Sequence, residues 1–501
     1  MLKDKVFRKR LVQCCRQTIE SPRLWQVGSS YKFSIPKTPY SYRNVDWIDF
    51  EDIVRYTGLV FEIAPTIEAQ RIPAASDVVF SYRFSKHGYV IDKRYNYKSF
   101  REKSSILSKQ SPFRVKINTD ISNFYDRLNL HRLESSLASL GCGSKYVSCL
   151  NELLFFWVDR NSFGLPVGCD ASRFLAEAAL IPVDRALQRE GIKFVRFVDD
   201  YRIFAKSFSQ AHAYLNILIQ ELDKESLFIN TSKTTFIDLE QHRTEPSEEP
   251  QKAAFDPEDE DARVEEKTFV TVGYISKLIK TYRYPGREQI KRYKNEVLTD
   301  LKNKTLNSRP DNLEENIRYF VRCFIYNDSR EIIDLIDVID RYVHSLTYIV
   351  DALIKEEGRF SDSEVELLSK AFCEMYEKYA RSPFFDLAIL RLLCHGRYQS
   401  LDFVRRTFDG LKLSTNPIFL REFILRTRDI ADREMLLSFR RLYSKVSLPV
   451  RRAIFHVIEK SDKLLDGEKY AWFKQVHKSE ADHYLKVMAG VRLGSRSKQK
   501  A

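Results

Sequence analysis

Three aspartates are the residues of this chain best suited to carry out chemistry. Asp120 ends the segment FRVKINTD, and Asp199 and Asp200 are adjacent within KFVRFVDDYRIFAKS. Two neighbouring acids in so apolar a setting would repel each other and be poorly solvated. A divalent cation relieves both problems, because Mg²⁺ prefers carboxylate oxygens together with substrate phosphates. The pattern predicts a two-metal site, in which one ion activates an attacking 3′ oxygen and the other holds a triphosphate and its leaving pyrophosphate.

The alternation of side chains predicts the elements that position these acids. One face of a strand would hold Phe113, Val115, Ile117 and Thr119, and the other would hold Arg114, Lys116, Asn118 and Asp120. Asp120 therefore ends a half-buried strand on its polar face, just before a helix. Asp199 and Asp200 lie between two short apolar runs, a pattern typical of a β-hairpin with both acids at its turn. Taken alone, such a pair is also common in turns that bind no metal.

Two further motifs accompany the aspartates. The sequence GLPVG from Gly164 to Gly168 feeds a predicted helix, and its glycines permit close approach of the backbone to a ligand such as a nascent base pair. The alternative is an ordinary turn that starts a helix. Lys233 lies in a polar break of LFINTSKTTF, where a cation could meet phosphate. By itself, Lys233 is simply a surface lysine.

The order of these motifs resembles that of the reverse transcriptase family. The family's four palm motifs are similar to Asp120–Tyr125 (DISNFY), Gly164–Gly168 (GLPVG), Phe197–Asp200 (FVDD) and Asn230–Thr234 (NTSKT) in this chain. The segment TVGY is similar to the part of the family that grips the primer strand, with Gly273 and Tyr274 as its functional residues. Four motifs in the same order are far more specific than any one of them.

The resemblance implies a role for each matched residue. The catalytic residues would be Asp120, Asp199, Asp200 and Lys233. The metal site would comprise Asp120, Ile121, Asp199 and Asp200 and would hold two Mg²⁺ ions, for which Mn²⁺ can substitute. The nucleotide would contact Arg83, Lys86, Tyr125, Gly164, Pro166 and Gly168. The ring of Tyr125 would exclude a ribose 2′-hydroxyl, although the same residue also fits a core aromatic on a helix.

One position departs from the usual family pattern. Val167 stands where retroviral and intron-type members usually have glutamine. The pattern that follows, Ser172-Arg173 and Ala176-Glu177, instead resembles the bacterial abortive-infection and defence-associated (AbiK-like) branch. Members of that branch join the polymerase to a HEAT-like helical domain, and several form oligomers, which implies a trimer or hexamer here. Some of them synthesise DNA without an ordinary template or start it from a tyrosine.

A tyrosine primer is therefore a hypothesis for this chain, with the residue itself unknown. Such a phenol must reach the metal site, which favours a loosely held segment. The stretch SSYKFSIPKTPYSYRN near the N-terminus contains the least constrained candidates, Tyr31, Tyr40 and Tyr42. Ordinary surface tyrosines are the alternative.

Composition and charge agree with a nucleic-acid partner. The net charge is +13, and residues 241–267 contain ten acidic and four basic side chains, so that the remainder carries about +19. A basic excess favours polyanions. The acidic stretch, with three prolines, predicts a solvated, mobile loop.

The N-terminus has charges where a signal peptide needs an apolar core, and no run of apolar residues is long enough to span a bilayer, which predicts a cytoplasmic protein without membrane contact. The eight cysteines show no metal-binding spacing and are expected to be reduced thiols.

The predicted fold class is α+β, with polymerase fingers and palm over residues 1–284 and an all-α, HEAT-like repeat domain over residues 285–501. Pro383, Pro417 and Pro449 recur at intervals of 34 and 32 residues, each at the start of an amphipathic stretch. Proline suits the first turn of a helix because the N–H it lacks has no partner there. Helix-pair repeats would explain the spacing. A simple helical bundle is the alternative.

The predicted function is that of an RNA-directed or untemplated DNA polymerase, which would add dNTPs by two-metal phosphoryl transfer in antiphage defence. Its partners would be dNTPs, the DNA product and a template or non-coding RNA. Two alternatives are a catalytically silent RNA-binding scaffold and a palm-fold nucleotide cyclase. The clustered carboxylates argue against the scaffold, because a binding module gains nothing from their repulsion. The GLPVG turn and Lys233 favour the polymerase over the cyclase.

Overall fold

The structure is a computed structural model of the whole chain. It describes residues 27–38, 41–85, 90–158, 161–244, 265–267, 279–281, 310–327, 330–378, 383–411 and 416–499, with isolated positions before residue 27 and at 301. Two compact units are present. The first comprises Met1–Lys32, Asn44–Lys252 and Thr268–Leu278, and the second comprises Phe33–Arg43, Ala253–Lys267 and Ile279–Ala501.

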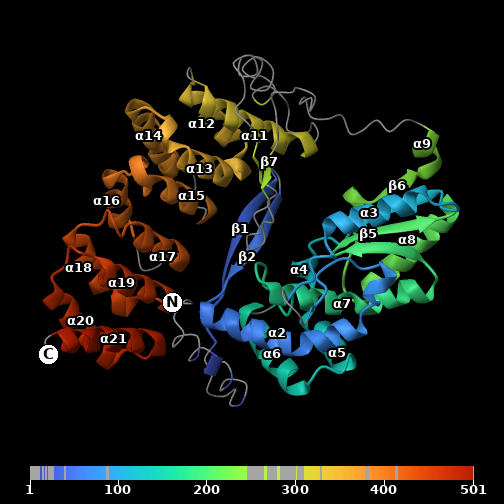
Figure 1. The fold of residues 1–501 in the computed structure, drawn as a ribbon, viewed down its shortest axis with the longest axis horizontal. Helices are drawn as coiled ribbons and strands as arrows, with labels where there is room; N and C mark the ends of the chain where they lie inside the picture. The colour runs from blue at the N-terminus through green and yellow to red at the C-terminus, as the bar shows by residue number, and fades with distance from the viewer. Residues whose placement is uncertain are drawn as a thin grey trace. The chain divides into compact units, whose positions relative to one another are not determined.

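A four-stranded antiparallel sheet forms the centre of the first unit, with the strand order β4-β5-β3-β6 (Figure 1). Its strands are β3 (Val115–Asp120), β4 (Lys193–Phe197), β5 (Asp200–Ala205) and β6 (Thr235–Asp238). Val115, Ile117 and Thr119 are buried, so the predicted alternation along β3 is confirmed. The acids at the end of β3 and the start of β5 therefore lie at one edge of a sheet with its core already filled.

Helices surround this sheet. They are α2 (Phe50–Gln70), α3 (Tyr97–Lys109), α4 (Phe124–Arg127), α5 (Leu130–Ser139), α6 (Ser144–Val158), α7 (Asp170–Arg189), α8 (Phe208–Lys224) and α9 (Leu239–Thr244). Helix α8 packs on β3 and β5, and α7 packs on α2, α5 and α8. Helix α3 packs on β4 and β5, where Phe100, Val195 and Phe204 form a separate apolar cluster. The hairpin of β1 (Tyr31–Thr38) and β2 (Ser41–Trp47) precedes these helices.

From Pro310 onward, the described residues of the second unit form helices and the turns between them, which confirms the prediction of an all-α C-terminal region. Its helices are α11 (Pro310–Tyr326), α12 (Ile332–Arg341), α13 (Leu346–Lys355), α14 (Asp362–Lys378), α15 (Pro383–Leu393), α16 (Leu401–Asp409), α17 (Pro417–Arg426), α18 (Arg433–Leu442), α19 (Leu448–Lys460), α20 (Asp466–Ser479) and α21 (His483–Gln499). A short ladder of β7 (Glu265–Lys267) and β8 (Ile279–Thr281) belongs to the same unit.

The packing of these helices follows the order of the chain. Helices α11, α13, α15, α17 and α19 contact one another in succession, and α12 contacts α14 (Figure 1). Pro383 and Pro417 begin their helices and Pro449 is the second residue of α19, as the spacing predicted. The side chain of Asn416 caps α17 by accepting the N–H groups of Ile418 and Phe419. Contact between every second helix is the arrangement of stacked helix pairs, in which each pair buries its apolar face against the next.

The structure also bears on the predictions about the cysteines, membrane-spanning segments and the acidic segment of residues 241–267. Six described cysteines are free thiols, as predicted: Cys142, Cys149, Cys169, Cys323, Cys373 and Cys394. Within the described residues, no helix has the length and apolar character needed to cross a membrane. The acidic segment is not a loop throughout, because its first four residues end α9 and its last three form β7; the residues between them lie outside the description.

The N-terminal tyrosines also differ from expectation. Tyr31 lies on β1, where its ring packs 5.9 Å from that of Trp47, and Tyr42 lies on β2 with 58% of its surface exposed. Two paired strands hold both residues, so the prediction that they are loosely held is wrong. Tyr40 lies outside the described residues.

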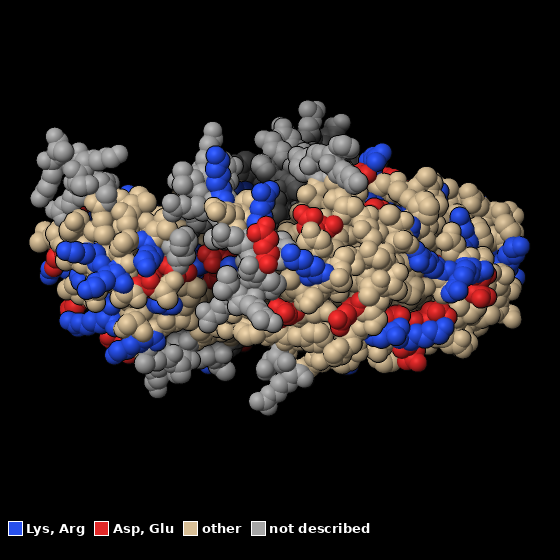
Figure 2. Space-filling model, turned by 90° about the horizontal axis from the view of Figure 1, so that it is seen from below, with Lys and Arg blue, Asp and Glu red and all other residues tan. Residues whose placement is uncertain are grey.

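Basic side chains are interspersed with acidic ones on the face shown in Figure 2, rather than forming one continuous patch there.

Candidate active site

The three aspartates meet at one edge of the sheet. Asp120 and Asp200 are direct partners across the antiparallel pair of β3 and β5, and Asp199 lies in the two-residue turn that joins β4 to β5. The N–H of Ile121 donates to the carbonyl of Asp199 at 3.1 Å, which ties the end of β3 to that turn. Residues opposite each other in an antiparallel pair project to the same face. The predicted strand and hairpin therefore converge as the sequence indicated.

The turn itself has an unusual backbone. Val198 has a φ of +57° and is buried, although β-branched residues rarely adopt this region. The first position of a two-residue hairpin turn is one that commonly uses glycine to reach such a φ. A conformation of this kind persists only where the surroundings hold it. The peptide that precedes Asp199 is thus fixed by contacts elsewhere in the fold.

The electrostatics of the site disfavour three free carboxylates. Burial, and then the charges of Asp200 and Asp120, raise the pKa of Asp199 from 3.8 to about 6. Asp120 is 6% exposed, and its Oδ1 is buried without a hydrogen-bond partner among the described residues. An acceptor oxygen without a donor is costly inside a protein. A cation at this edge would satisfy the oxygen and relieve the repulsion.

Lys233 supplies part of that positive charge. Its Nζ donates to Oδ2 of Asp120 at 2.6 Å, while more than half of the lysine side chain stays exposed. The hydrogen bond with Asp120 raises the pKa of Lys233. Backbone contacts fix the segment that carries it, because the N–H of Asn230 donates to the carbonyl of Asp120 at 2.7 Å. The structure therefore brings together the acids and the lysine that the sequence selected from segments far apart.

These residues fit a divalent metal ion by their chemistry. In the described part of the chain, no three His, Cys, Asp or Glu side chains are already arranged as a closed metal cage. Mg²⁺ sites in nucleotide enzymes need no such cage, because waters and substrate phosphates complete the coordination of one or two carboxylates. The unpartnered oxygen of Asp120 and the raised pKa of Asp199 are the features that an ion would relieve.

The GLPVG turn lies against the helix that carries Tyr125. The N–H of Leu165 donates to the carbonyl of Tyr125 at 2.9 Å, and the N–H of Gly164 donates to Leu128 at 2.8 Å. Gly164 has a φ of +99°, and a Cβ there would lie 3.5 Å from the carbonyl oxygen of Asp126. Tyr125 itself is half-buried against the core of the first unit. This position is compatible with both predicted roles of the Tyr125 ring, as a core aromatic and as a wall of the site.

The remaining members of the turn are held by neighbours that the sequence did not reveal. Pro166 is buried, and its carbonyl accepts the hydroxyl of Ser172 at 2.5 Å, while Gly168 is exposed with a φ of +131°. Asp46 makes reciprocal contacts with the backbone of Val167: its Oδ2 accepts the N–H at 3.0 Å, and its own N–H donates to the carbonyl at 3.3 Å. Burial raises the pKa of Asp46. Sequence reasoning missed Asp46, because no motif marks a residue 121 positions away from its partner.

Comparison with known proteins agrees with this geometry. Residues 79–297 match the family described as "Reverse transcriptase (RNA-dependent DNA polymerase)". The chain contains a reverse transcriptase domain. The match identifies an enzyme domain of the nucleotidyltransferase class, in which divalent metal ions generally serve as cofactors. It ends before α11, the first of the stacked helices that the structure describes.

Two solved telomerase structures resemble this chain at low sequence identity. The chain is similar to the solved telomerase of Candida albicans in complex with a TWJ fragment of telomeric RNA, at 13% identity and a TM-score of 0.33, over 71% of this chain and 63% of that one. It is also similar to the apo telomerase of Candida tropicalis, at 13% identity and a TM-score of 0.31, over 73% and 69% of the two chains. This chain therefore spans less than two thirds of the first of these proteins. No curated protein matches the sequence.

One predicted contact of the reverse transcriptase domain needs correction. Arg83 does not face a nucleotide, because it is 2% exposed and its guanidinium is already occupied. It donates to the carbonyls of Val79 at 3.1 Å and Ile72 at 2.8 Å and pairs with Glu68 at 2.9 Å. Local sequence does not distinguish Arg83 from a surface arginine, because the burial of a charged residue depends on the partners that folding brings to it. Lys86, Gly273 and Tyr274 lie outside the described residues.

Proposed function

We propose that this chain is a DNA polymerase that adds deoxynucleotides to a 3′ hydroxyl in a reaction dependent on Mg²⁺ or Mn²⁺. Asp120, Asp199 and Asp200 would hold the ions, with the backbone of Ile121 beside them. When bound, the ions would polarise the attacking hydroxyl and neutralise the triphosphate and leaving pyrophosphate. The residues of the chain itself supply the rigid edge of the sheet, the positive charge of Lys233 and the walls around the nucleotide.

The observation that carries this proposal is the register of β3 and β5. It sets Asp120 directly opposite Asp200, beside a buried carboxylate oxygen that lacks a partner among the described residues. A protein that used this fold only as a scaffold would retain the repulsion between the acids without any benefit. The match to the reverse transcriptase family over residues 79–297 supports the same chemistry.

Two other residues have proposed roles in nucleotide addition. Lys233, whose Nζ lies 2.6 Å from Oδ2 of Asp120, would contact a phosphate oxygen or transfer a proton to the leaving group. Tyr125 lies on α4, which begins four residues after β3 ends and contacts the GLPVG turn through its backbone. A ring in this place would leave no room for a ribose 2′-hydroxyl and would favour dNTPs over rNTPs.

The biological setting is part of the proposal. The Ser172-Arg173 and Ala176-Glu177 pattern and the stacked helices from residue 310 resemble the abortive-infection branch. This resemblance favours antiphage defence in the bacterial cytoplasm, an RNA partner or untemplated synthesis, and a homo-oligomer. Synthesis primed by a tyrosine belongs to the same set of proposals, with no residue assigned. DNA that remains attached to the protein on a denaturing gel, and maps to one tyrosine by mass spectrometry, would support priming. DNA with an ordinary 5′ end would contradict it.

The experiment that tests the polymerase proposal is incorporation of labelled dNTPs by purified wild-type protein with Mg²⁺ or Mn²⁺. Asp120→Asn and Asp199→Asn should each lose incorporation. Asp238→Asn is the matched control, because Asp238 pairs with Val115 at the opposite end of β3 and touches none of the three acids. Activity that survives in Asp120→Asn, or is lost equally in Asp238→Asn, would contradict the assignment of the site.

A further inference from the structure

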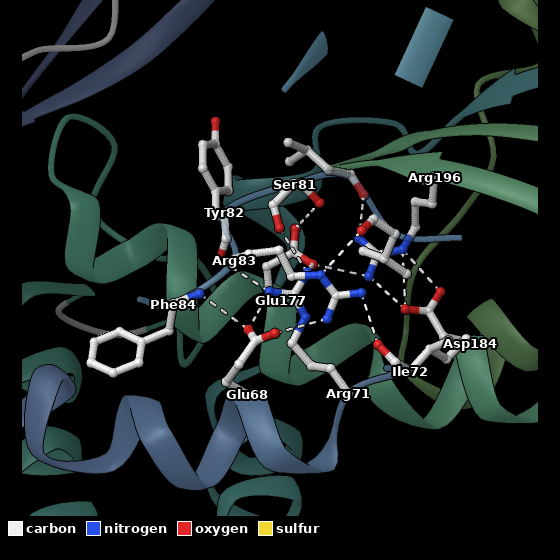
Figure 3. Close-up of polar contacts among 12 residues, drawn as sticks. Glu68, Arg71, Ile72, Ser81, Tyr82, Arg83, Phe84, Glu177, Asp184 and Arg196 are labelled. Atoms are coloured by element: carbon white, nitrogen blue, oxygen red, sulfur yellow. Dashed lines mark hydrogen bonds and ion pairs between the residues drawn. The ribbon is translucent and has the colours of Figure 1, made fainter. Parts of the chain in front are cut away.

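A network of buried charges lies beneath the catalytic hairpin (Figure 3). Four of its ionic members are Arg71 at the end of α2, Glu177 and Asp184 on α7, and Arg196 on β4, and their side chains are 0–5% exposed. Glu68 of α2, which is 22% exposed, extends the network by pairing with both Arg71 and Arg83, so that three positive and three negative charges balance. Glu177 and Asp184 are seven residues apart, so they lie on one face of α7, two turns from each other. A buried network of this kind gains little stability over apolar packing, so that a contribution to stability alone does not account for it.

Arg196 connects this network to the catalytic turn. Its Nε and one terminal nitrogen hold Asp184 at 2.9 and 2.5 Å, and the same terminal nitrogen contacts Glu177 at 3.0 Å. The other terminal nitrogen donates to the carbonyl oxygen of Val198 at 2.8 Å. That carbonyl belongs to the peptide bond whose nitrogen is that of Asp199. Fixing its orientation therefore fixes the backbone from which the Asp199 carboxylate projects.

Asp184 holds the other strand of the same hairpin. Tyr201, one residue after Asp200, donates its hydroxyl to Oδ1 of Asp184 at 3.3 Å. Arg196 and Tyr201 are direct partners across β4 and β5. One carboxylate thus contacts both strands just below the turn. This contact explains how Val198 keeps its positive φ, since a strained turn needs surroundings that hold it.

The network also joins the turn to residues 78–82. Glu177 accepts the Ser81 hydroxyl at 2.5 Å and a terminal nitrogen of Arg71 at 2.7 Å, and Arg71 also donates to the carbonyls of Ser81 and Tyr82. The backbone of Arg196 pairs with the same segment, donating to Val78 and accepting from Phe80. A shift in residues 78–82 is therefore transmitted directly to Arg196.

We infer that Arg196 is a positioning residue for nucleotide addition. Supported by Asp184 and Glu177, it holds the Val198–Asp199 peptide in the orientation in which the Asp199 carboxylate would hold metal ions together with Asp120 and Asp200. This inference rests on the proposed function, in that the ions and the nucleotide are those of the polymerase reaction. Arg196 touches neither substrate nor ion, and acts through the backbone of the turn.

The test is Arg196→Lys, because lysine keeps the charge but cannot hold Asp184 through two nitrogens and Val198 through a third. Partners that orient metal ligands typically change metal affinity by about 10- to 100-fold when lost. Arg196→Lys should therefore raise the Mg²⁺ concentration for half-maximal dNTP incorporation about 10-fold or more. It should weaken Mn²⁺ binding, measured by electron paramagnetic resonance without nucleotide, by a similar factor, while the KM for dNTP at saturating metal changes far less.

Arg330→Lys is the matched control. The side chain of Arg330 is 7% exposed, pairs with Glu364 and donates to the backbone carbonyls of Ile325 and Arg359, and all of these residues belong to the second unit. The control substitution should lower the melting temperature about as much as Arg196→Lys does, and it should leave the affinity for Mn²⁺ at the wild-type value. Equal Mn²⁺ affinity for Arg196→Lys and the wild type would overturn the inference.

A second variant covers the case in which Arg196→Lys does not fold. Tyr201→Phe removes only the 3.3 Å contact with Asp184 and should weaken Mn²⁺ binding in the same direction by a smaller factor. Wild-type Mn²⁺ affinity in this variant would then overturn the inference. If the wild type binds Mn²⁺ at the aspartates but incorporates no dNTP, the polymerase proposal fails, while the Mn²⁺ comparison still decides the role of Arg196.

Discussion

Replacing Asp199 with asparagine should stabilise the free protein at neutral pH. A carboxyl whose pKa rises from 3.8 to about 6 on folding is disfavoured in its charged form by about 3 kcal/mol, at 1.36 kcal/mol per pKa unit. Water that reaches a half-buried side chain screens part of this, so we expect a gain of about 1–3 kcal/mol in the free energy of unfolding. Asparagine retains the size of the side chain and has no charge to desolvate.

The sign of the pH dependence follows from the same pKa values. Between about pH 4 and pH 6 the folded state binds more protons at Asp199 than the unfolded state does, so this group makes the wild type less stable as pH rises. The advantage of Asp199→Asn should be complete above the folded pKa, near pH 7.5, and should disappear below about pH 4, where both states of the wild type are protonated.

Urea unfolding at pH 7.5 and pH 4, with and without MgCl₂, measures each part of this prediction. Mg²⁺ should stabilise the wild type by binding its folded state, and should stabilise Asp199→Asn much less. Asp238→Asn serves as the control, because it removes a carboxylate from the same sheet at the end far from the site. A less stable Asp199→Asn at pH 7.5, or an equal response of both proteins to Mg²⁺, would refute the reasoning.

Three other substitutions have defined outcomes. Tyr125→Val should admit rNTPs, and an unchanged ratio of dNTP to rNTP incorporation would return Tyr125 to a purely structural role. Asp184→Asn should cost about 3–5 kcal/mol in urea unfolding, because it leaves the buried guanidinium of Arg196 partly uncompensated; a loss under 1 kcal/mol would mean that the network relaxes easily. Gly164→Ala should cost about 1–3 kcal/mol, because alanine rarely adopts its φ of +99°, and wild-type stability would show that the turn can shift.

The sequence was most informative where a local pattern controls the structure. Alternation along β3 predicted which side chains are buried and placed Asp120 at the end of the strand. The apolar runs around Asp199 and Asp200 predicted their hairpin, and prolines predicted three helix starts. In each case the deciding interactions are with residues a few positions away in the chain or in the paired strand.

The sequence was least informative where contacts between different secondary-structure elements determine whether a side chain is buried or paired. Arg83 and Arg196 carry the same side chain as any surface arginine, yet both are buried, because Glu68 on α2 and Asp184 on α7 pair with them. Tyr31 and Tyr42 fall in a polar stretch that reads as a loop, but two strands pair there. Asp46 has no motif at all and is identified only by its contacts with Val167. Such residues depend on tertiary structure that no local spacing encodes.

The most direct test of the central claim is to measure pyrophosphate release and nucleotide incorporation together, using purified wild-type protein, dNTPs and Mg²⁺. A polymerase predicts one pyrophosphate for each deoxynucleotide found in a chain resistant to denaturation, and both should stop when EDTA removes the metal. Pyrophosphate released without any polymer would indicate a cyclase. Neither product, from folded protein with its copurified nucleic acid present and with Mg²⁺ or Mn²⁺ supplied, would contradict the polymerase and leave an RNA-binding scaffold.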